Sequence, residues 1–172
     1  MIEEARSVAD FAGFGEVCRA YVDWCRTRYR EMPWFVEEVF GYQALDEELK
    51  ILAAKYGPPN GRTMIARIDG QIVAGGAYKT LSGDICELKR LFVGEGARGL
   101  GLGRTLLEAL IVSAKVDGFV AMRLDTGTLM REAIAMYQAA GFEAIAPYLT
   151  YPDRLMPYLI FMEKKLAPLP LA

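Results

Sequence analysis

The fold that this sequence predicts is decided by residues 98–104, Arg98-Gly99-Leu100-Gly101-Leu102-Gly103-Arg104. Glycines at every second position let the backbone N–H groups converge, and the apolar spacing that follows predicts a helix. Because a helix N-terminus carries partial positive charge, this loop is suited to hold a pyrophosphate. An ordinary strand-to-helix turn is the competing interpretation. The apolar side of the predicted helix consists of Leu106, Leu107, Leu110, Ile111 and Ala114.

Strands and a second helix flank this loop. The segment 86–93 alternates in its first half and ends in the apolar run Leu91-Phe92-Val93, which predicts a strand entering a covered site. Downstream, 120–125 reads as a strand, a helix around Tyr137 ends at Gly141, and 158–163 reads as the last strand.

The N-terminal third reads as helices, followed by a hairpin. Helical spacing is clear over 16–29, Pro33 interrupts it, and a second helix spans 45–56. Two strands then flank Asp69-Gly70, a strong hairpin signal. The order αα-ββ-β-α-β-α-β predicts one α/β (α+β) domain over 1–172, with a mixed sheet that is antiparallel first and then parallel.

Composition excludes several functions. The chain of 172 residues has 20 Lys+Arg against 22 Asp+Glu, a formal charge of -2, which argues against a nucleic-acid partner. It contains no histidine, so Ser-His-Asp nucleophiles and His-bound metals are excluded, and we expect no metal. The three cysteines contain no C-x-x-C and are expected to be reduced thiols.

Neither a signal peptide nor a membrane helix is visible in the sequence. The start, Met1-Ile2-Glu3-Glu4, is acidic, and no apolar stretch reaches the ~20 residues that span a bilayer. We therefore expect a soluble, cytoplasmic protein without a membrane partner.

A second glycine pattern overlaps the loop. Residues 94–99 satisfy G-x-G-x-x-G after a strand, which is typical of dinucleotide binding. The context disagrees, because Gly101 and Gly103 would weaken the required helix and Asp117 sits in a turn before Gly118. A nucleotide-dependent reductase is therefore a minor alternative, which predicts binding of NAD(P)H and none of CoA.

In this order the elements resemble the GNAT superfamily of acyl-CoA-dependent N-acyltransferases. Three pieces carry the resemblance: the signature 98–103, the strand end 91–93, and the segment 132–142 with its Tyr137 and Gly141-Phe142. The resemblance implies a mixed, mostly antiparallel central sheet with a parallel splayed strand pair and helices on both faces. It also implies acetyl-CoA as co-substrate.

By the same resemblance, backbone groups of Leu91, Phe92 and Val93 would bind the pantetheine arm, and one N–H would polarise the acetyl carbonyl. Tyr137 matches a family tyrosine that protonates the leaving thiolate. The family often has Asn where Met130 stands, and that role is not carried over. The residues implied in pyrophosphate binding are Arg98, Gly99, Leu100, Gly101, Leu102, Gly103 and Arg104.

Two carboxylates are candidates for the base. Strand alternation places Glu87 on the same face as Lys89 and Leu91, and Asp125 ends the adjacent strand. We rank Glu87 slightly first. Either carboxylate could instead be paired with a cation such as Arg90 or Arg123. A substrate amine that enters neutral would need no protein base.

The predicted reaction is direct transfer of acetyl to a primary amine in a ternary complex. The alternative is a non-catalytic CoA-binding or regulatory module, and a homodimer is possible. The acceptor, whether small molecule or peptide, stays open. Acceptor contacts are expected from 29–42 and 147–157, and Glu31, Glu37 and Glu38 could attract a cationic amine. The aromatic residues of these segments are Trp34, Phe35, Phe40, Tyr42, Tyr148 and Tyr151.

Overall fold

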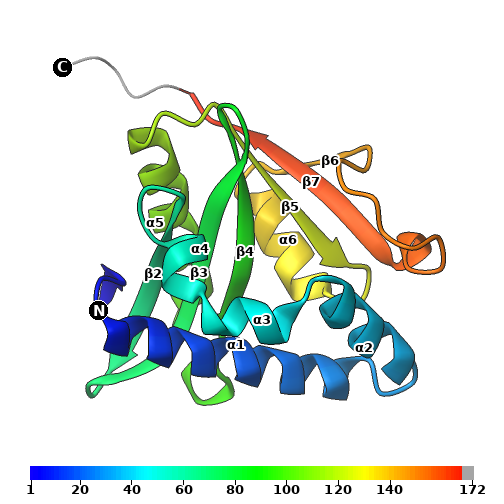
Figure 1. Ribbon diagram of the computed structural model, residues 1–172, viewed down its shortest axis with the longest axis horizontal. Helices are drawn as coiled ribbons and strands as arrows, with labels where there is room; N and C mark the ends of the chain where they lie inside the picture. The colour runs from blue at the N-terminus through cyan, green and yellow to red at the C-terminus, as the bar shows by residue number, and fades with distance from the viewer. Residues whose placement is uncertain (168–172) are drawn as a thin grey trace.

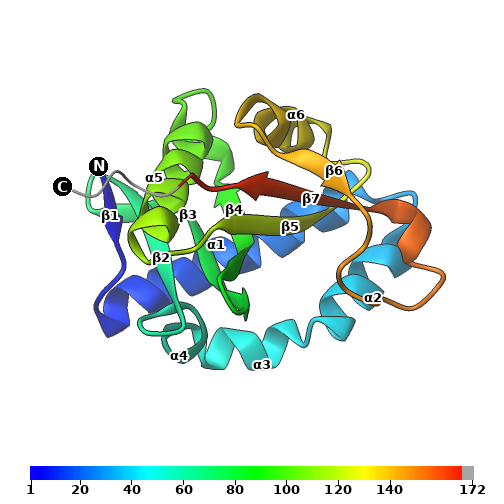
Figure 2. The same ribbon diagram turned by 90° about the horizontal axis from the view of Figure 1, so that it is seen from above.

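The computed structural model describes residues 1–167; the last five residues of the predicted domain, 168–172, lie outside the described part. It contains one seven-stranded sheet with helices on both faces (Figures 1 and 2). The strands are β1 (Ile2–Glu4), β2 (Gly61–Ile68), β3 (Gln71–Ser82), β4 (Ile85–Val93), β5 (Ala121–Gly127), β6 (Glu143–Ile145) and β7 (Leu159–Lys165). The α-helices are α1 (Val8–Arg28), α2 (Pro33–Tyr42), α3 (Leu45–Lys50), α4 (Leu52–Tyr56), α5 (Leu102–Val116) and α6 (Arg131–Ala139). Two 3-10 turns are η1 (Glu95–Ala97) and η2 (Met156–Tyr158).

The sheet confirms the predicted mixture of strand directions. Its order is β1-β2-β3-β4-β5-β7-β6, and the β4–β5 pair is parallel while the other pairs are antiparallel. The parallel pairing runs from Ile85 to Glu87 on β4 and then ends. Beyond that point β4 and β5 diverge, as Figure 1 shows. The splayed pair that the sequence led us to expect is therefore present.

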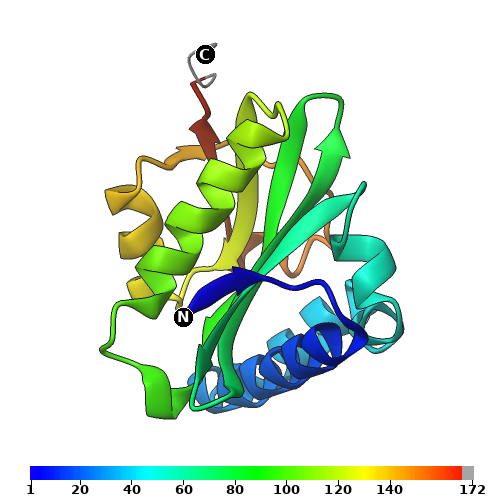
Figure 3. The same cartoon turned by 90° about the vertical axis from the view of Figure 1, so that its left-hand side faces the viewer.

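The helices divide between the two faces (Figures 2 and 3). On one face α1 packs on β3 and β4, and α4 on β2 and β3. On the other face α5 packs on β2, β3 and β4 through its buried apolar side, beginning at Leu106, and α6 contributes Tyr137 to the same core. The splay is thus bordered by α1 and α2 on one face and α6 on the other.

The predicted hairpin is confirmed at Asp69-Gly70. These residues have φ angles of 49° and 80°, the left-handed conformation that a two-residue turn joining β2 and β3 requires. Aspartate and glycine tolerate this conformation better than most residues, which explains why the sequence signal was reliable.

A β-bulge in β4 corrects one prediction. Gly76 on β3 lies opposite two residues, Arg90 and Leu91, and Arg90 has a φ of 59°. An extra residue reverses the alternation beyond it. Lys89 accordingly shares a face with Glu87, as predicted, whereas Leu91 packs in the core under α5, so its predicted placement beside them was wrong.

Other differences concern short elements. Helix α1 already ends at Arg28, before Pro33, and Pro33 instead begins α2, where a missing N–H is harmless. The predicted helix 45–56 is two helices separated at Ile51, whose φ is -127°. Strands β1 and β6, of three residues each, were not predicted, because such short edge strands have no recognisable alternation.

The start of α1 yields a stability prediction. Asp10 and Ser7 form a capping box, and the backbone N–H groups of Arg6 and Ser7 lower the pKa of Asp10 from 3.8 to about 2. A carboxyl group whose pKa is lower in the folded than in the unfolded protein stabilises the fold at pH values above the unfolded-state pKa. This stabilisation is lost as the pH falls through the folded-state pKa. We expect Asp10→Asn to lower the free energy of unfolding by about 1 kcal/mol at pH 7.

Urea unfolding at pH 7, 4 and 2 checks this, because the difference should shrink from about pH 4 and largely vanish near pH 2. The matched control is Asp23→Asn, whose carboxylate is 73% exposed and pairs with Arg26 on the same helix. That control should change stability by less than about 0.5 kcal/mol. A penalty for Asp10→Asn that is equal at pH 7 and pH 2 would contradict the account.

Candidate active site

A cavity of about 80 Å³ lies where β4 and β5 diverge. Residues from both faces of the sheet line it, with Phe35 and Val36 of α2 on one side and Tyr137 of α6 on the other. Its floor is formed by the ends of the two splayed strands, residues 88–91 and 124–127. The splay therefore opens the sheet to a small molecule at one point.

The glycine loop at the start of α5 presents unpaired donors. Within the described residues, no backbone N–H from Gly99 to Arg104 donates a hydrogen bond to the protein. Gly99 and Gly101 have φ angles of 81° and 75°, which only glycine adopts without strain. Together with the α5 N-terminus, these N–H groups fit a pyrophosphate.

The splayed edge of β4 fits an extended chain beside that loop. Beyond Glu87 the β5-facing edge of β4 has no strand partner in the described sheet, and this edge includes Leu91, Phe92 and Val93. Free backbone groups of this kind can pair with an amide-containing arm such as pantetheine. Edge and loop therefore offer the backbone groups that an amide-containing arm and a pyrophosphate would each require.

Arg98 lies across the joint between these two parts. Its Nε donates to the Val93 carbonyl at 3.3 Å, and its guanidinium carbon lies 4.9 Å from the Trp24 ring centre and 5.5 Å from that of Phe92. This cation–π contact ties the start of the loop to α1. Leu100 is 63% exposed and Arg104 is exposed. These two residues can therefore contribute to ligand binding only through their backbone groups or by contacting a ligand that lies on the protein surface.

Tyr137 lies within the cavity wall. Its ring is 7% exposed and packs against Phe142, with ring centres 5.8 Å apart, and none of the hydrogen bonds in the described part of the chain involves its hydroxyl. Burial, followed by the nearby Asp125 carboxylate, raises the pKa of Tyr137 well above its ordinary value. The phenol is therefore protonated at neutral pH and able to donate a proton.

Lys89 joins the two candidate carboxylates. Its Nζ lies 2.6 Å from Asp125 Oδ1 and 3.1 Å from Glu87 Oε1. Burial is the largest single influence and would raise the pKa of Asp125, but the charge and hydrogen bond of Lys89, the Tyr151 hydroxyl and the Arg90 charge together lower it. Asp125 is thus ionised at neutral pH. The cation that pairs with Asp125 is Lys89. Of the two arginines considered from the sequence, Arg123 pairs with Glu163 and Arg90 pairs with Glu48.

The two carboxylates differ in access. Among the described residues that line the cavity, Asp125 is present and Glu87 is not. Glu87 is 1% exposed and is held by Lys89, by Lys79 at 3.4 Å, and by the Tyr148 hydroxyl. The geometry therefore favours Asp125 for contact with a substrate.

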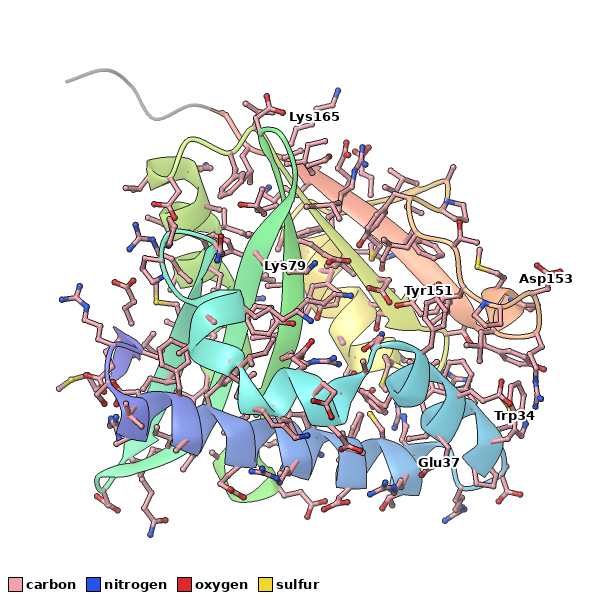
Figure 4. All side chains as sticks on the ribbon, viewed as in Figure 1. Trp34, Glu37, Lys79, Tyr151, Asp153 and Lys165 are labelled. Atoms are coloured by element: carbon pink, nitrogen blue, oxygen red, sulfur yellow. The ribbon has the colours of Figure 1, made fainter. Side chains whose placement is uncertain are left out.

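The predicted acceptor segments reach the site in different ways. Phe35 and Phe40 line the cavity. The Tyr148 and Tyr151 hydroxyls donate to Glu87 at 3.0 Å and to Asp125 at 2.8 Å, which anchors the segment before β7 over the sheet. Figure 4 shows Tyr151 and Lys79 over the sheet, with Trp34 near the molecular edge.

The glutamates of α2 are not part of the cavity wall. Glu37 lies 3.1 Å from Arg26, and Glu38 lies 2.8 Å from Arg154. Tyr42 is 56% exposed and donates to the Thr150 carbonyl. These side chains therefore form surface contacts between α2 and the neighbouring segments, and surface ion pairs of this kind contribute little to stability.

A second set of buried polar groups was not predicted. Arg90 donates through Nε to Glu48 at 2.7 Å and through Nη1 to Gln43 at 2.8 Å, and Lys55 also binds Glu48. Arg90 and Gln43 line the cavity. The sequence held no signal for this set because only the bulge turns Arg90 toward α3.

Two further observations concern residues 1–167. Across this range no three His, Cys, Asp or Glu side chains are grouped closely enough to hold a metal ion. The helices of the same range are all too short or too polar to cross a membrane.

A splayed sheet, a glycine loop with unpaired N–H groups and a protonated tyrosine in the gap together fit an enzyme that uses acyl-CoA. Comparison with known proteins agrees. Residues 18–142 match the model of the Acetyltransferase (GNAT) family, and the chain belongs to this family. The resemblance to the GNAT superfamily that the sequence indicated is thereby confirmed, and the protein is an enzyme of the N-acetyltransferase class.

Individual relatives give the same result. An uncharacterised N-acetyltransferase of Schizosaccharomyces pombe is 33% identical over 128 residues, 73% of this chain and 77% of that protein. An IAA acetyltransferase of Azospirillum brasilense is 39% identical over 110 residues, 63% of this chain and 70% of that protein.

Solved structures extend the comparison to the fold. A structure described as an acyl-CoA N-acyltransferase from Klebsiella pneumoniae is 31% identical, with a TM-score of 0.60 over 73% of this chain and 86% of that one. An acetyltransferase from Streptococcus agalactiae is 20% identical, with a TM-score of 0.75 over 96% of this chain and 98% of that one. The latter likeness concerns the fold alone.

Proposed function

We propose that this chain, acting as one domain, transfers acetyl from acetyl-CoA directly to a primary amine within a ternary complex. The observation that carries the proposal is the cavity between β4 and β5, which brings Tyr137 and Asp125 to one opening beside an unpaired strand edge. Bound acetyl-CoA would supply the acetyl group as an activated thioester.

The chain's own backbone would hold the co-substrate. The loop 99–104 donates N–H groups toward the pyrophosphate, and the edge of β4 around Leu91, Phe92 and Val93 pairs with the pantetheine arm. A backbone N–H of this edge would also polarise the acetyl carbonyl, which is where negative charge develops during acyl transfer.

Tyr137 would act as the acid. Tyr137 lines the cavity, and its raised pKa keeps the hydroxyl proton in place at neutral pH. The sulfur of a departing thiolate is much more basic than the sulfur of the intact thioester. A positioned phenol therefore stabilises mainly the transition state.

Asp125 would receive the proton of the amine, through a water, or hold the amine in place. We place it before Glu87 because it lines the cavity. Glu87 would then position Lys89, which in turn fixes the Asp125 carboxylate at 2.6 Å.

Direct transfer is supported by the state of the cavity thiol. Cys25 lines the cavity, and burial raises its pKa to about 12. A thiol with that pKa supplies little thiolate at neutral pH and is a poor nucleophile. The sequence contains no histidine to activate it.

Two measurements test the mechanism. Initial rates over a matrix of acetyl-CoA and amine concentrations should give intersecting double-reciprocal lines, as a ternary complex requires. Protein incubated with acetyl-CoA alone should keep its intact mass. Parallel lines together with a mass increase of one acetyl group would overturn direct transfer in favour of an acetyl-enzyme.

The glycine loop gives a separate prediction. Gly101→Ala should raise KM for acetyl-CoA about fivefold, because alanine at a φ of 75° costs roughly 1 kcal/mol and displaces the loop N–H groups. A Cβ there meets no atom within 4 Å, so the effect is confined to backbone conformation.

The matched control is Gly96→Ala, in the same connection. A Cβ there also meets nothing within 4 Å, and its φ is not in the left-handed region. Steady-state kinetics should show an unchanged KM for the control. Equal effects of the two substitutions would contradict a specific role for the conformation of Gly101.

A further inference from the structure

The cavity has two polar ends and one apolar wall. Asp125 lines it at the β5 side, and Arg90 lines it at the β4 bulge. A chain of three hydrogen bonds connects them: Asp125 accepts from Tyr151, Gln43 donates to Tyr151, and Arg90 donates to Gln43. The two ends are therefore neighbours held by one network.

One nitrogen of the Arg90 guanidinium is not used by the described residues around it. Its side chain is only 5% exposed, and its Nε and Nη1 groups are used by Glu48 and Gln43. In the described part of the chain its Nη2 group has no hydrogen-bond partner. A buried guanidinium that lines a cavity and keeps free N–H groups is suited to a carboxylate, since both are planar.

Charge is distributed unevenly along the network. The Arg90 end combines Arg90 and Lys55 with the single carboxylate of Glu48, an excess of one positive charge. The other end combines Asp125 and Glu87 with Lys89 and Lys79, so its charges balance, and Asp125 is the carboxylate of this set that lines the cavity. The arrangement fits a ligand that is cationic at one end and anionic at the other.

The bulge explains why this arrangement exists. Arg90 adopts a φ of 59°, an uncommon conformation for a side chain of its size. Bulges of this kind re-aim a side chain, and such strain is typical of functional sites. Here the bulge places Arg90 on the same face as Lys89, its neighbour in the chain.

The remaining wall limits the body of the ligand. Phe35, Val36 and Leu159 line the cavity, so the space beside the two polar ends is apolar. The whole cavity, polar ends included, has a volume of about 80 Å³, so little room is left for an apolar group. Only a compact apolar group would fit beside the polar ends.

We propose that the acceptor is a free amino acid with a compact apolar side chain, whose carboxylate binds Arg90 and whose amine lies at Asp125. This inference rests on the proposed transferase function and names its substrate class. The reaction balances simply: the amine nitrogen forms a bond to the acetyl carbon, the thioester C–S bond breaks, the amine proton leaves toward Asp125, and the thiolate takes a proton from Tyr137.

Two readouts test the proposal separately from the transferase function. The first is calorimetric binding of L-valine to the protein saturated with CoA. The second is release of free thiol from acetyl-CoA with L-valine, valinamide or isobutylamine, three ligands with the same apolar group. We expect valine binding, and a kcat/KM for valine at least tenfold above those of the two ligands without a carboxylate.

Variants assign the preference to Arg90. Replacing the pair together, Glu48→Gln with Arg90→Gln, avoids leaving a buried carboxylate unpaired. Valine should then lose its advantage, so that its kcat/KM falls to within about threefold of the value for isobutylamine measured with the same variant. Gln43→Glu, which places a negative charge beside Arg90 with little change of shape, should do the same if the double variant does not fold. Arg62→Gln, which removes an Arg paired with Glu4 and Asp117, should keep the preference.

The outcomes separate the two claims. Equal turnover of valine, valinamide and isobutylamine would overturn the amino-acid proposal and leave the transferase function standing. Valine binding that depends on Arg90 without acetylation of any amine would support the carboxylate site and overturn the transferase. Absence of valine binding to the wild-type protein would overturn the proposal.

Discussion

Tyr137→Phe is expected to lower kcat about a hundredfold and to leave KM for acetyl-CoA within twofold. A positioned general acid contributes this much or more, and the phenol makes its interaction chiefly in the transition state. The fold should be retained, because the ring keeps its contact with Phe142 and the hydroxyl has no partner among the described residues. Steady-state kinetics and a thermal melt measure both effects.

The pH dependence follows from the same residue. Because burial and Asp125 raise the pKa of Tyr137, its hydroxyl stays protonated through the ordinary assay range. The kcat profile should therefore show no alkaline decline from this group below about pH 10. With no histidine in the chain, no imidazole should titrate near neutrality either.

Tyr78→Phe is the matched control. The Tyr78 hydroxyl is part-buried and donates to Asp117 at 2.6 Å, and Tyr78 is not among the residues that line the cavity. Its removal should cost about 1 kcal/mol of stability and change kcat less than twofold. A Tyr137→Phe enzyme as active as wild type, or a control equally impaired, would contradict the role of Tyr137.

Gly127→Ala is expected to destabilise the protein by about 2–3 kcal/mol. A Cβ at Gly127 would lie 2.0 Å from Tyr29 Oη and 3.1 Å from Tyr29 Cζ. Tyr29 is 1% exposed and packs against Phe35 with ring centres 4.8 Å apart, so it cannot move aside cheaply. All three residues line the cavity, and the shift should also impair acceptor binding.

A double-mutant cycle isolates this contact. The Tyr29 hydroxyl is buried and has no hydrogen-bond partner among the described residues, so Tyr29→Phe alone should be nearly neutral. Combined with Gly127→Ala, it should recover at least about 1 kcal/mol by removing the closest atom. Gly41→Ala, in α2 with no atom near its Cβ, controls for a general effect of replacing glycine and should not destabilise. Strictly additive losses in urea titrations would contradict the predicted clash.

The elements with strong local signals were predictable from the sequence. Asp69-Gly70 set the hairpin, and the glycines of 98–104 set the turn into α5, because both turns require left-handed backbone conformations. The strands β1 and β6 were missed because their existence depends on pairing with β2 and β7, not on their own three residues.

The site was predictable in position but not in detail. Leu91 and Tyr137 both line the cavity, as the resemblance implied, whereas the loop 98–104 is not part of its lining and its role stays a prediction. The roles of Lys89 and Arg90 could not be foreseen, because alternation assumes a regular strand and the bulge at Arg90 breaks it. The ranking of Glu87 before Asp125 could not be checked from the sequence either, because the two side chains are 2% and 4% exposed and only their position relative to the cavity distinguishes them.

The central claim is that acetyl moves from acetyl-CoA to an amine on this chain. Its most direct test is an acceptor screen at saturating acetyl-CoA, in which free thiol and N-acetylated product are measured together. We predict equal amounts of the two products for at least one primary amine, and neither product without an amine. Tight binding of acetyl-CoA with no amine acetylated across a broad panel would contradict the claim and indicate a non-catalytic CoA-binding module.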